Sequence, residues 1–437
     1  MDRYTLVLMR TVSFDKAARR GFVASIASVP LAVALSRRQA FGSRASKEPA
    51  CSTGLDRLFL DTIEPYRGMK VGLIANPASV DRNLVHAADR FAASRELKLA
   101  ALFGPQHGFK SDQQDNMIES ADEIDPRLGI PVHSLYGEHR KPTSRMLKGL
   151  DVVFCDLFDV GARAYTFMWT MALAMEACAE ARVRFVVLDR PNPIGGMDVE
   201  GNVLDPEFRS FIGLHPLPMR HGLTAGELAT FLNKEYSIGA NLEVIEVRGW
   251  KRELWLDQTN LPWVMPSPNM ATLETATVYP GTVLVEGTNL SEGRGTTHPF
   301  ELVGAPFIDP HRLADRLNAS NLPAVRFRPT WFKPVYDKWR DRLCGGVQIH
   351  VLDRGAFRPY LTGLALLSAV IELYPKQFAW RQPPFEYEYK KMPVDILAGT
   401  SAIREGLGKQ ALPAVLAISW QPGLERFHKI RAKYLRY

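Results

Sequence analysis

Short apolar runs alternate along the chain with segments whose apolar residues recur at helical spacing. The runs predict strands at residues 70–75, 99–103, 152–155, 185–188 and 242–247, with a weaker strand near 130–135. Helices are expected between them, at about 84–92, 166–181 and 228–236. Thr224 and Glu227 fit a capping box ahead of the last of these helices. Continuous apolar strands separated by helices indicate a parallel sheet with both faces covered.

The pattern changes beyond residue 266, where prolines are frequent and long apolar runs are few. We therefore place a domain boundary near residue 275. Past it, the sequence predicts a strand over 282–285, another over 346–351 and a helix over 361–374. A segment rich in tyrosine, phenylalanine and tryptophan follows at 378–389.

The first 45 residues have the layout of an export signal. Arg19 and Arg20 precede an apolar stretch at 22–35, and small residues follow it. The order Arg-Arg-x-Phe resembles a twin-arginine signal. An uncleaved membrane anchor or a misassigned start codon is the alternative, but the stretch is short for a membrane-spanning helix. We expect an exported, periplasmic protein with no stable membrane insertion once the signal is cleaved.

Composition narrows the function classes. Of the 437 residues, 46% are hydrophobic and 23% charged, as in ordinary soluble domains, and part of the net charge of +7 comes from the first 44 residues. No basic run with interleaved aromatics supports nucleic-acid binding. Glycine-rich phosphate loops, a G-x-S-x-G elbow and H-E-x-x-H are all missing, and the four cysteines form no CxxC pair. We expect no cofactor and no metal, and the pairing of the cysteines stays open.

Polar side chains gather directly after the predicted strands. Asn76, the pair Gln106 and His107, Asp156 with Asp159, and the pair Asp189 and Arg190 all occupy such positions. Ligands of open α/β sheets bind at the carboxyl ends of the strands, so these positions predict a cleft. Asp156 and Asp189 are equally compatible with helix caps.

Residues 287–297 form the most polar loop of the chain, with Glu292, Arg294, Asn289 and hydroxyl groups set between glycines. Glycine allows a close approach of the backbone to a ligand, which favours a binding loop over a plain turn. Paired carboxylates are the requirement of glycoside hydrolysis, and a buried carboxylate beside a like charge acquires the raised pKa of a general acid. Arginine and asparagine side chains suit the hydroxyl and acidic groups of a sugar.

Several longer motifs in fixed order resemble the exo-β-N-acetylmuramidase family of bacterial cell-wall hydrolases. They include residues 72–79 (GLIANPAS), 103–109 (FGPQHGF), 134–137 (SLYG), 140–143 (RKPT), 159–163 (DVGAR), 188–196 (LDRPNPIGG), 220–224 (RHGLT), 266–270 (PSPNM) and the polar loop through Glu301. The resemblance covers the chain from about residue 56 onward. It implies a Rossmann-like, mostly parallel α/β domain at 56–275, a smaller α+β domain at 276–437, and an active site between them.

The resemblance also implies an activity, namely release of N-acetylmuramic acid from the non-reducing end of peptidoglycan fragments. Many relatives have glutamate where this chain has Gln106, and an amide cannot act as a general acid. We therefore expect Glu292 to be the catalytic carboxylate, Glu119 its reserve, and His107 to orient the substrate beside it. The substrate-binding residues are expected to be Asn76, Gln106, Asp159, Arg163, Tyr165, Asp189, Arg190, Asn192, His221, Asn289, Arg294 and Thr296.

Two other functions stay open on the sequence. The glutamine at position 106 is compatible with a non-catalytic protein that binds muropeptides or sugars on the same fold. A lyase that forms a 1,6-anhydro product is the third possibility, since that reaction needs no water as nucleophile.

Overall fold

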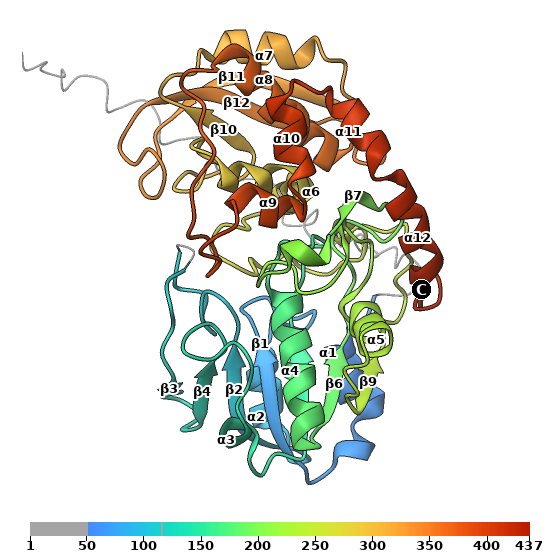
Figure 1. Ribbon diagram of the computed structural model, residues 1–437. Coiled ribbons are helices and arrows are strands. Elements are labelled where there is room, and N and C mark those ends of the chain that lie inside the picture. Colours follow the sequence, from blue (N-terminus) through green and yellow to red (C-terminus); the bar gives the residue numbers. More distant parts are fainter. Residues whose placement is uncertain (1–50, 115–116) are drawn as a thin grey trace, which may run out of the picture. The chain divides into compact units, whose positions relative to one another are not determined.

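A computed structural model describes residues 51–114 and 117–437 (Figure 1), so the expected export signal at 1–45 lies outside the described residues. In the part of the chain that it describes, the main sheet has the strand order β3-β4-β2-β1-β5-β6-β9. Its strands are β1 (Lys70–Ala75), β2 (Lys98–Gly104), β3 (Glu123–Ile124), β4 (Pro131–Ser134), β5 (Val152–Asp156), β6 (Arg184–Leu188) and β9 (Leu242–Ile245). Strand β3 pairs antiparallel with β4, and the other neighbours pair in parallel.

Helices cover both faces of this sheet. They are α1 (Gly54–Arg57), α2 (Ala87–Ala93), α3 (Ser144–Leu147), α4 (Phe167–Ala181) and α5 (Ala225–Glu235). Helix α4 crosses one face (Figure 1) and packs with Ile74, Val153 and Val187. The opposite face, with Leu73 and Phe154, packs against α1 and α2. Because side chains alternate between faces, two-sided burial requires uninterrupted apolar strands, and the α/β prediction is confirmed.

The remaining elements of this half are shorter. Strands β7 (Glu200–Val203) and β8 (Pro218–Arg220) form a two-stranded sheet, a π-helical turn covers Leu58–Thr62, and 3-10 turns cover Glu64–Tyr66, Pro206–Phe208 and Leu256–Gln258. Thr224 caps α5 in a capping box with Glu227, as predicted. The methionines of α4 are buried in the core. One helix prediction was too long, because Leu84 is 60% exposed in a left-handed turn and α2 begins only at Ala87.

Past residue 272 the chain forms an antiparallel sheet packed with helices. The order β10-β12-β11 joins β10 (Leu302–Ala305), β12 (Cys344–Val351) and β11 (Val325–Phe332). The helices are α6 (Leu273–Thr282), α7 (Pro310–Asn318), α8 (Pro359–Leu373), α9 (Pro393–Ala398), α10 (Ala402–Gly408), α11 (Pro413–Ser419) and α12 (Gln421–Arg431). Helix α7 packs on β11 and β12, and α6 packs on α8. This arrangement is the expected α+β part.

The strand predicted at 282–285 is wrong. These residues end helix α6 and continue into a 3-10 turn at Val283–Gly287. Thr272 caps α6 by accepting the amide of Thr275, and every residue from Thr275 to Thr282 is buried. A helix buried on all sides shows no amphipathic period, so its short apolar run cannot be told from a strand by pattern.

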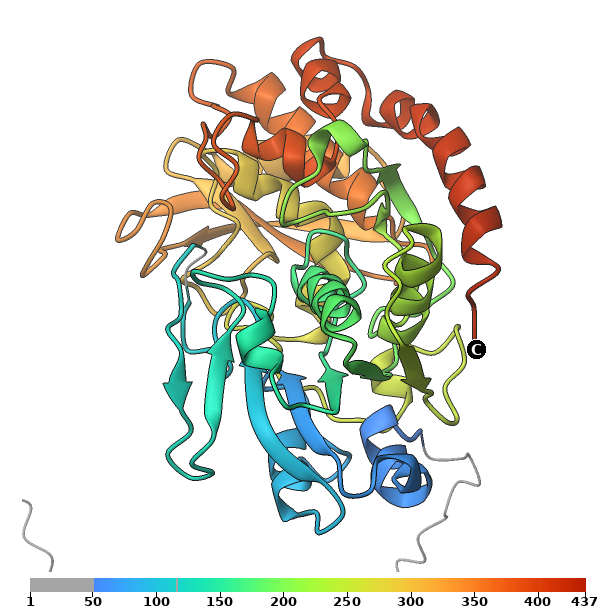
Figure 2. The ribbon, with the colours of Figure 1, turned by 60° about the horizontal axis from the view of Figure 1, so that its bottom comes forward.

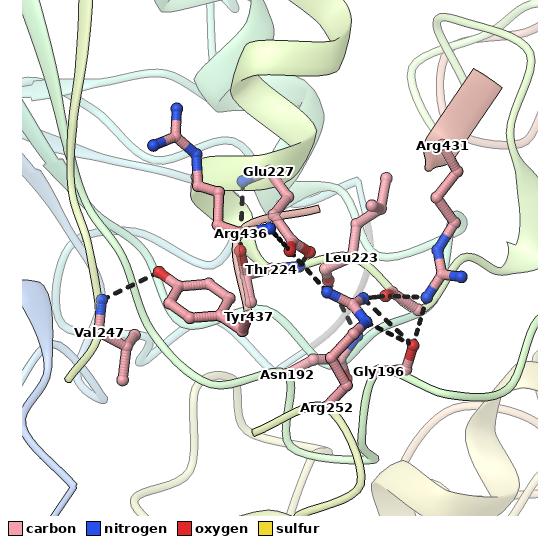
Figure 3. A network of polar contacts seen from close by, with 12 residues as sticks. Asn192, Gly196, Leu223, Thr224, Glu227, Val247, Arg252, Arg431, Arg436 and Tyr437 are labelled. Carbon is pink, nitrogen blue, oxygen red and sulfur yellow. Dashed lines mark hydrogen bonds and ion pairs between the residues drawn. The ribbon is translucent and has the colours of Figure 1, made fainter. Parts of the chain in front are cut away.

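Helix α12 and the residues after it return to the first half of the chain. In Figures 1 and 2 this helix (red) runs along the green segment that contains β7. Phe427 packs edge-on against Phe231 of α5, with ring centroids 6.0 Å apart. Figure 3 shows the polar part of the contact, in which Arg252 pairs with Glu227 at 2.6 Å. Arg431 also donates to the carbonyl of Gly222 at 2.8 Å.

Tyr437 also takes part in the contact between the segment after α12 and the first half of the chain. Its hydroxyl accepts the Val247 amide at 2.9 Å (Figure 3) and donates to the buried carboxylate of Asp189 at 2.6 Å. Burial raises the pKa of Asp189 to about 6.

We expect Tyr437→Phe to lower the free energy of unfolding by about 2 kcal/mol at pH 8, because the buried carboxylate of Asp189 loses a hydrogen-bond donor. Urea unfolding measures it, Tyr389→Phe at a 67% exposed tyrosine is the control, and equal midpoints would contradict the expectation.

All four cysteines are buried free thiols, which answers the pairing question left by the sequence. Burial raises the pKa of Cys51 and of Cys178 to about 12, so neither is a thiolate at neutral pH. Among the described residues, no helix is both long and apolar enough to cross a membrane.

Candidate active site

A narrow cavity lies where the end of β2 and the start of α4 meet segments of the second half of the chain. Its volume is about 40 Å³, which is below the range of roughly 300–1,000 Å³ usual for small-molecule sites. No lining residue is more than 8% exposed. The lining comprises Gln106, His107, Ala164, Tyr165, Thr166, Phe167, Ile212, Ser267, Asn269, Met270, Tyr279, Val283, Glu286, Arg294, Phe300, Phe385, Glu386 and Leu397.

Glu386 brings a carboxyl group to this cavity from a tight hairpin turn. Phe385 and Glu388 exchange backbone hydrogen bonds of 3.0 and 2.9 Å across the turn. Both central residues are left-handed, with φ of 45° at Glu386 and 64° at Tyr387. Such turns favour asparagine and glycine, so a glutamate and a tyrosine here carry strain. Backbone strain of this kind clusters at functional sites, and the cavity residues His107 (φ 72°) and Phe300 (φ 65°) share it.

Two neutral donors hold the Glu386 carboxyl group. Tyr136 donates its hydroxyl to Oε2 at 2.8 Å, and the Gln106 amide donates Nε2 to Oε1 at 3.2 Å. Burial raises the pKa of Glu386 to about 7. The charge of Glu286 adds to the rise, while both hydrogen bonds and the charge of Arg294 oppose it. Glu386 therefore titrates near neutral pH, where a general acid is most effective.

Glu286 supplies a second carboxyl group to the lining. Arg294 pairs with it at 2.7 Å, and the Arg294 guanidinium lies 5.2 Å from the centre of the Phe300 ring. The cavity thus contains two carboxyl groups in unlike surroundings, one in an ion pair and the other between neutral donors. Environments that differ in this way separate the protonation states of two carboxyl groups.

Glu292 stands apart from the lining, in an ion-pair cluster behind Arg294. Its Oε1 lies 3.1 Å from Arg294 Nε, and its Oε2 lies 2.7 Å from Lys338 Nζ. Burial alone would raise the pKa of Glu292, but Lys338 and Arg294 outweigh it and the pKa is lowered. Lys338 also donates to the carbonyls of Val285, Thr288 and Leu290, at 3.1, 3.2 and 2.7 Å. The cluster shapes the polar loop, and the Glu292 side chain contacts the cavity lining at Arg294.

The other residues of the predicted loop bond to the protein itself. Asn289 accepts the Ala379 amide at 3.0 Å and donates to the Gln377 carbonyl at 2.8 Å. Thr296 donates to the Gly293 carbonyl at 2.6 Å. Glu119 is exposed and accepts the hydroxyl of Tyr387 at 3.4 Å, so it contacts the turn that carries Glu386.

Three of the predicted residues after β2 and before α4 do line the cavity, namely Gln106, His107 and Tyr165. The Nδ1 atom of His107 lies 2.7 Å from the Gln113 carbonyl, which can only accept, so Nδ1 carries the proton. Burial, with a contribution from Arg294, lowers the pKa of His107 to about 4. His107 is therefore neutral at pH 7, and its Nε2 is a hydrogen-bond acceptor.

The polar residues at the ends of the other strands mostly pair within the sheet edge. Arg190 binds Asp156 through Nε at 2.6 Å and Nη2 at 2.8 Å. Asp189 accepts the Thr224 hydroxyl and the Gly226 amide, both at 2.8 Å, so it caps α5. Asn76 accepts the hydroxyl of Ser79 at 3.1 Å.

The remaining predicted residues bond to neighbouring loops. Asn192 donates to the Leu223 carbonyl at 2.9 Å, and Asp159 lies 3.4 Å from His221. Arg163 donates to the carbonyls of Leu397 and Ala398, both at 2.9 Å, and so ties the start of α4 to the end of α9. The Arg163 contact holds Leu397, a lining residue, beside the segment that precedes α4.

Sequence reasoning did not single out Glu386, Tyr136 or Thr166. Glu386 was hidden in the aromatic segment 378–389, where a glutamate and a tyrosine sit at positions that tight turns usually give to glycine. Tyr136 belongs to the motif at 134–137, but nothing in the sequence indicates that it meets a residue 250 positions away.

Comparisons with known proteins identify the family of this chain. The family described as "Exo-beta-N-acetylmuramidase NamZ" matches with its N-terminal part at residues 71–274 and its C-terminal part at 277–437. The peptidoglycan beta-N-acetylmuramidase NamZ of Bacillus subtilis (strain 168) is 45% identical over 395 residues, which cover 90% of this chain and 93% of that protein.

Solved structures of two DUF1343 family proteins from Bacteroides fragilis NCTC 9343 are also similar. The first is 35% identical with a TM-score of 0.80, and the second is 26% identical with a TM-score of 0.70. Each comparison covers 89% of this chain and 99% of the other. The resemblance drawn from the sequence motifs is confirmed, and the chain belongs to the NamZ family of exo-β-N-acetylmuramidases.

Proposed function

We propose that this protein is an exo-acting glycosidase that releases N-acetylmuramic acid from the non-reducing end of peptidoglycan fragments. The observation that carries the proposal is the buried cavity with Glu286 and Glu386 in its lining. Glycoside hydrolysis uses a carboxylic acid to protonate the leaving oxygen and a carboxylate that acts as a base or a nucleophile. The two groups come from segments 100 residues apart, so the site exists only in the folded chain.

The enclosure of the cavity supports exo action. Every lining residue is at least nine-tenths buried and the cavity is small, so the middle of a long glycan is excluded from it. Tyr165, Tyr279 and Phe300 supply aromatic surface, and Asn269 and the neutral His107 supply groups that bond to hydroxyls. Membership in the NamZ family favours this enzyme over the non-catalytic binding protein.

Export is part of the proposal, because peptidoglycan lies outside the cytoplasmic membrane. The twin-arginine-like order at Arg19 and Arg20 and the apolar stretch after it support a periplasmic location. Fractionation of cells that express the full chain tests it, and retention of the full-length protein in the cytoplasm would contradict it.

Incubation of the purified protein with a chromogenic N-acetylmuramic acid glycoside, and with peptidoglycan fragments, tests the activity. We expect release of the chromophore and of the free sugar from the fragments. Binding of the fragments without turnover would show that the protein is a binding protein and not an enzyme. Mass spectrometry separates hydrolysis from the lyase reaction, because an anhydro product is one water lighter.

A further inference from the structure

We propose that Glu386 is the general acid of this reaction and that Gln106 and Tyr136 are positioning residues that direct its proton into the cavity. The inference rests on the proposed glycosidase function and assigns its first chemical step. It follows from the directions of the hydrogen bonds around the Glu386 carboxyl group.

Gln106 can only donate to Glu386. Its carbonyl oxygen accepts the hydroxyl of Thr166 at 2.6 Å, which leaves the amide nitrogen on the side of Glu386. Its Nε2 then faces both Glu386 Oε1 and the Tyr136 hydroxyl, each at 3.2 Å. An amide nitrogen carries no acceptor, so Gln106 cannot take a proton from Glu386.

Tyr136 is likewise a donor to Glu386. Its hydroxyl oxygen already accepts two N–H groups, from Met117 at 3.1 Å and from Gln106 at 3.2 Å. These two hydrogen bonds use both lone pairs of the Tyr136 hydroxyl oxygen. The hydroxyl hydrogen is therefore donated to Glu386 Oε2, at 2.8 Å. With a donor on each oxygen, a protonated Glu386 finds no acceptor in Gln106 or Tyr136. Its O–H is therefore available to a substrate in the cavity.

The turn holds this carboxyl group in place. The Arg140 guanidinium lies 3.4 Å from the centre of the Tyr387 ring, and Tyr136 meets the same ring edge-on with centroids 5.7 Å apart. Phe385 is buried, with Arg381 over its ring at 5.1 Å. Contacts on both sides of Glu386 offset the strain of two left-handed residues, which indicates a position determined by the surrounding structure.

The step balances as an acid-assisted cleavage. The Glu386 proton passes to the glycosidic oxygen as the bond from the anomeric carbon to that oxygen breaks, and the bonding electron pair leaves with the oxygen. Glu386 becomes a carboxylate, which the donors Gln106 and Tyr136 stabilise. Water supplies the hydroxyl group of the released sugar and returns one proton, so the net reaction is hydrolysis.

Glu386→Gln tests the assignment with two substrates that differ in the leaving group. A disaccharide of N-acetylmuramic acid and N-acetylglucosamine needs a protonated leaving oxygen, whereas nitrophenolate leaves without a proton. We expect kcat/KM to fall about 10³-fold for the disaccharide and less than about tenfold for the nitrophenyl glycoside. Glu388→Gln, in the same turn but bonded to the amides of Lys390 and Lys391, is the matched control and retains wild-type rates.

Tyr136→Phe provides an independent readout through the pH profile. Loss of a donor to the carboxylate raises the pKa of Glu386, so the alkaline limb of kcat/KM for the disaccharide moves to higher pH. A purely structural role of Tyr136 would lower the rate without moving the limb.

The outcomes separate the two proposals. Wild-type protein that turns over neither substrate overturns the glycosidase function. Active wild type with an unimpaired Glu386→Gln variant, or equal losses on both substrates, overturns only the assignment of Glu386. If Glu386→Gln does not fold, the pH profile of the Tyr136→Phe variant is the test. An alkaline limb of kcat/KM at the wild-type pH then overturns the assignment of Glu386.

Discussion

Replacement of Glu292 by glutamine is expected to lower the free energy of unfolding by about 3–5 kcal/mol. The side chain is 1% exposed and lies within an ion pair of both Lys338 and Arg294. The amide keeps the shape of the carboxylate but removes the only negative charge paired with Lys338 among the described ion pairs. The Lys338 side chain is 16% exposed, so solvent screens the cation left without its counter-charge less than it screens a surface ion pair.

Urea unfolding of Glu292→Gln measures this effect, with Glu274→Gln at an exposed glutamate as the matched control. A loss below about 1 kcal/mol would contradict a structural role for the cluster. The same protein also tests the expectation, drawn from the sequence, that Glu292 is the catalytic carboxylate. At a temperature where the variant is folded, we expect its turnover of the disaccharide to exceed that of Glu386→Gln.

The second large effect concerns stability at Glu386. Its pKa is about 7 in the folded protein and 4.5 for the ordinary carboxyl group. A group with a raised pKa takes up a proton on folding between these values, so its contribution to stability falls as pH rises through that window. This rise of the pKa corresponds to about 3 kcal/mol. Above pH 7 the wild-type protein therefore carries a buried carboxylate that destabilises it.

Glu386→Gln removes this titration. We expect its unfolding free energy, relative to wild type, to increase by about 3 kcal/mol between pH 4.5 and pH 8. Denaturant curves at the two pH values give the difference directly. Glu388→Gln is the control, since backbone amides lower the pKa of Glu388 and no such gain is expected. A pH-independent difference for Glu386→Gln would show that Glu386 titrates normally.

Together, these two glutamates show different uses of a buried carboxyl group. Glu292 is neutralised by Arg294 and Lys338 and supports the loop at 287–297. Glu386 instead accepts hydrogen bonds from the neutral side chains of Gln106 and Tyr136 and keeps its proton near neutral pH. A variant that is more stable and less active at pH 8 would be the expected consequence of a site built for proton transfer.

Much of the first half of the fold was predictable from local pattern. The strand predicted at 70–75 matches β1, and the strands near 99–103, 152–155 and 185–188 match β2, β5 and β6 within one or two residues. These strands are buried on both faces, so every position must be apolar and the signal is continuous. The Thr224 capping box was equally readable, because both of its partners lie within one helical turn.

The hydrophobic pattern gave a wrong prediction where a similar apolar run is buried as part of a helix. Residues 282–285 contain two valines and a leucine and were expected to form a strand, but they lie at the junction of α6 and a 3-10 turn. The packing of α6 on α8 decides between the two states, and that contact joins residues about 80 positions apart. Local propensity carries no information about such a contact.

The candidate site divides in the same way. The sequence by itself determined the α/β class, the family, the polar loop at 287–297 and the positions of Gln106, His107 and Tyr165 after or beside strands, because each depends on residues close together in the chain. Only the tertiary structure decided which carboxyl groups share the cavity. Glu386 contacts Gln106, which is 280 positions away in the chain, and Glu292 contacts Lys338, which is 46 positions away. Both carboxyl groups are shielded from solvent, so their partners determine their protonation states. The neutral partners of Glu386 make it a proton donor, and the cations beside Glu292 make it part of an ion pair.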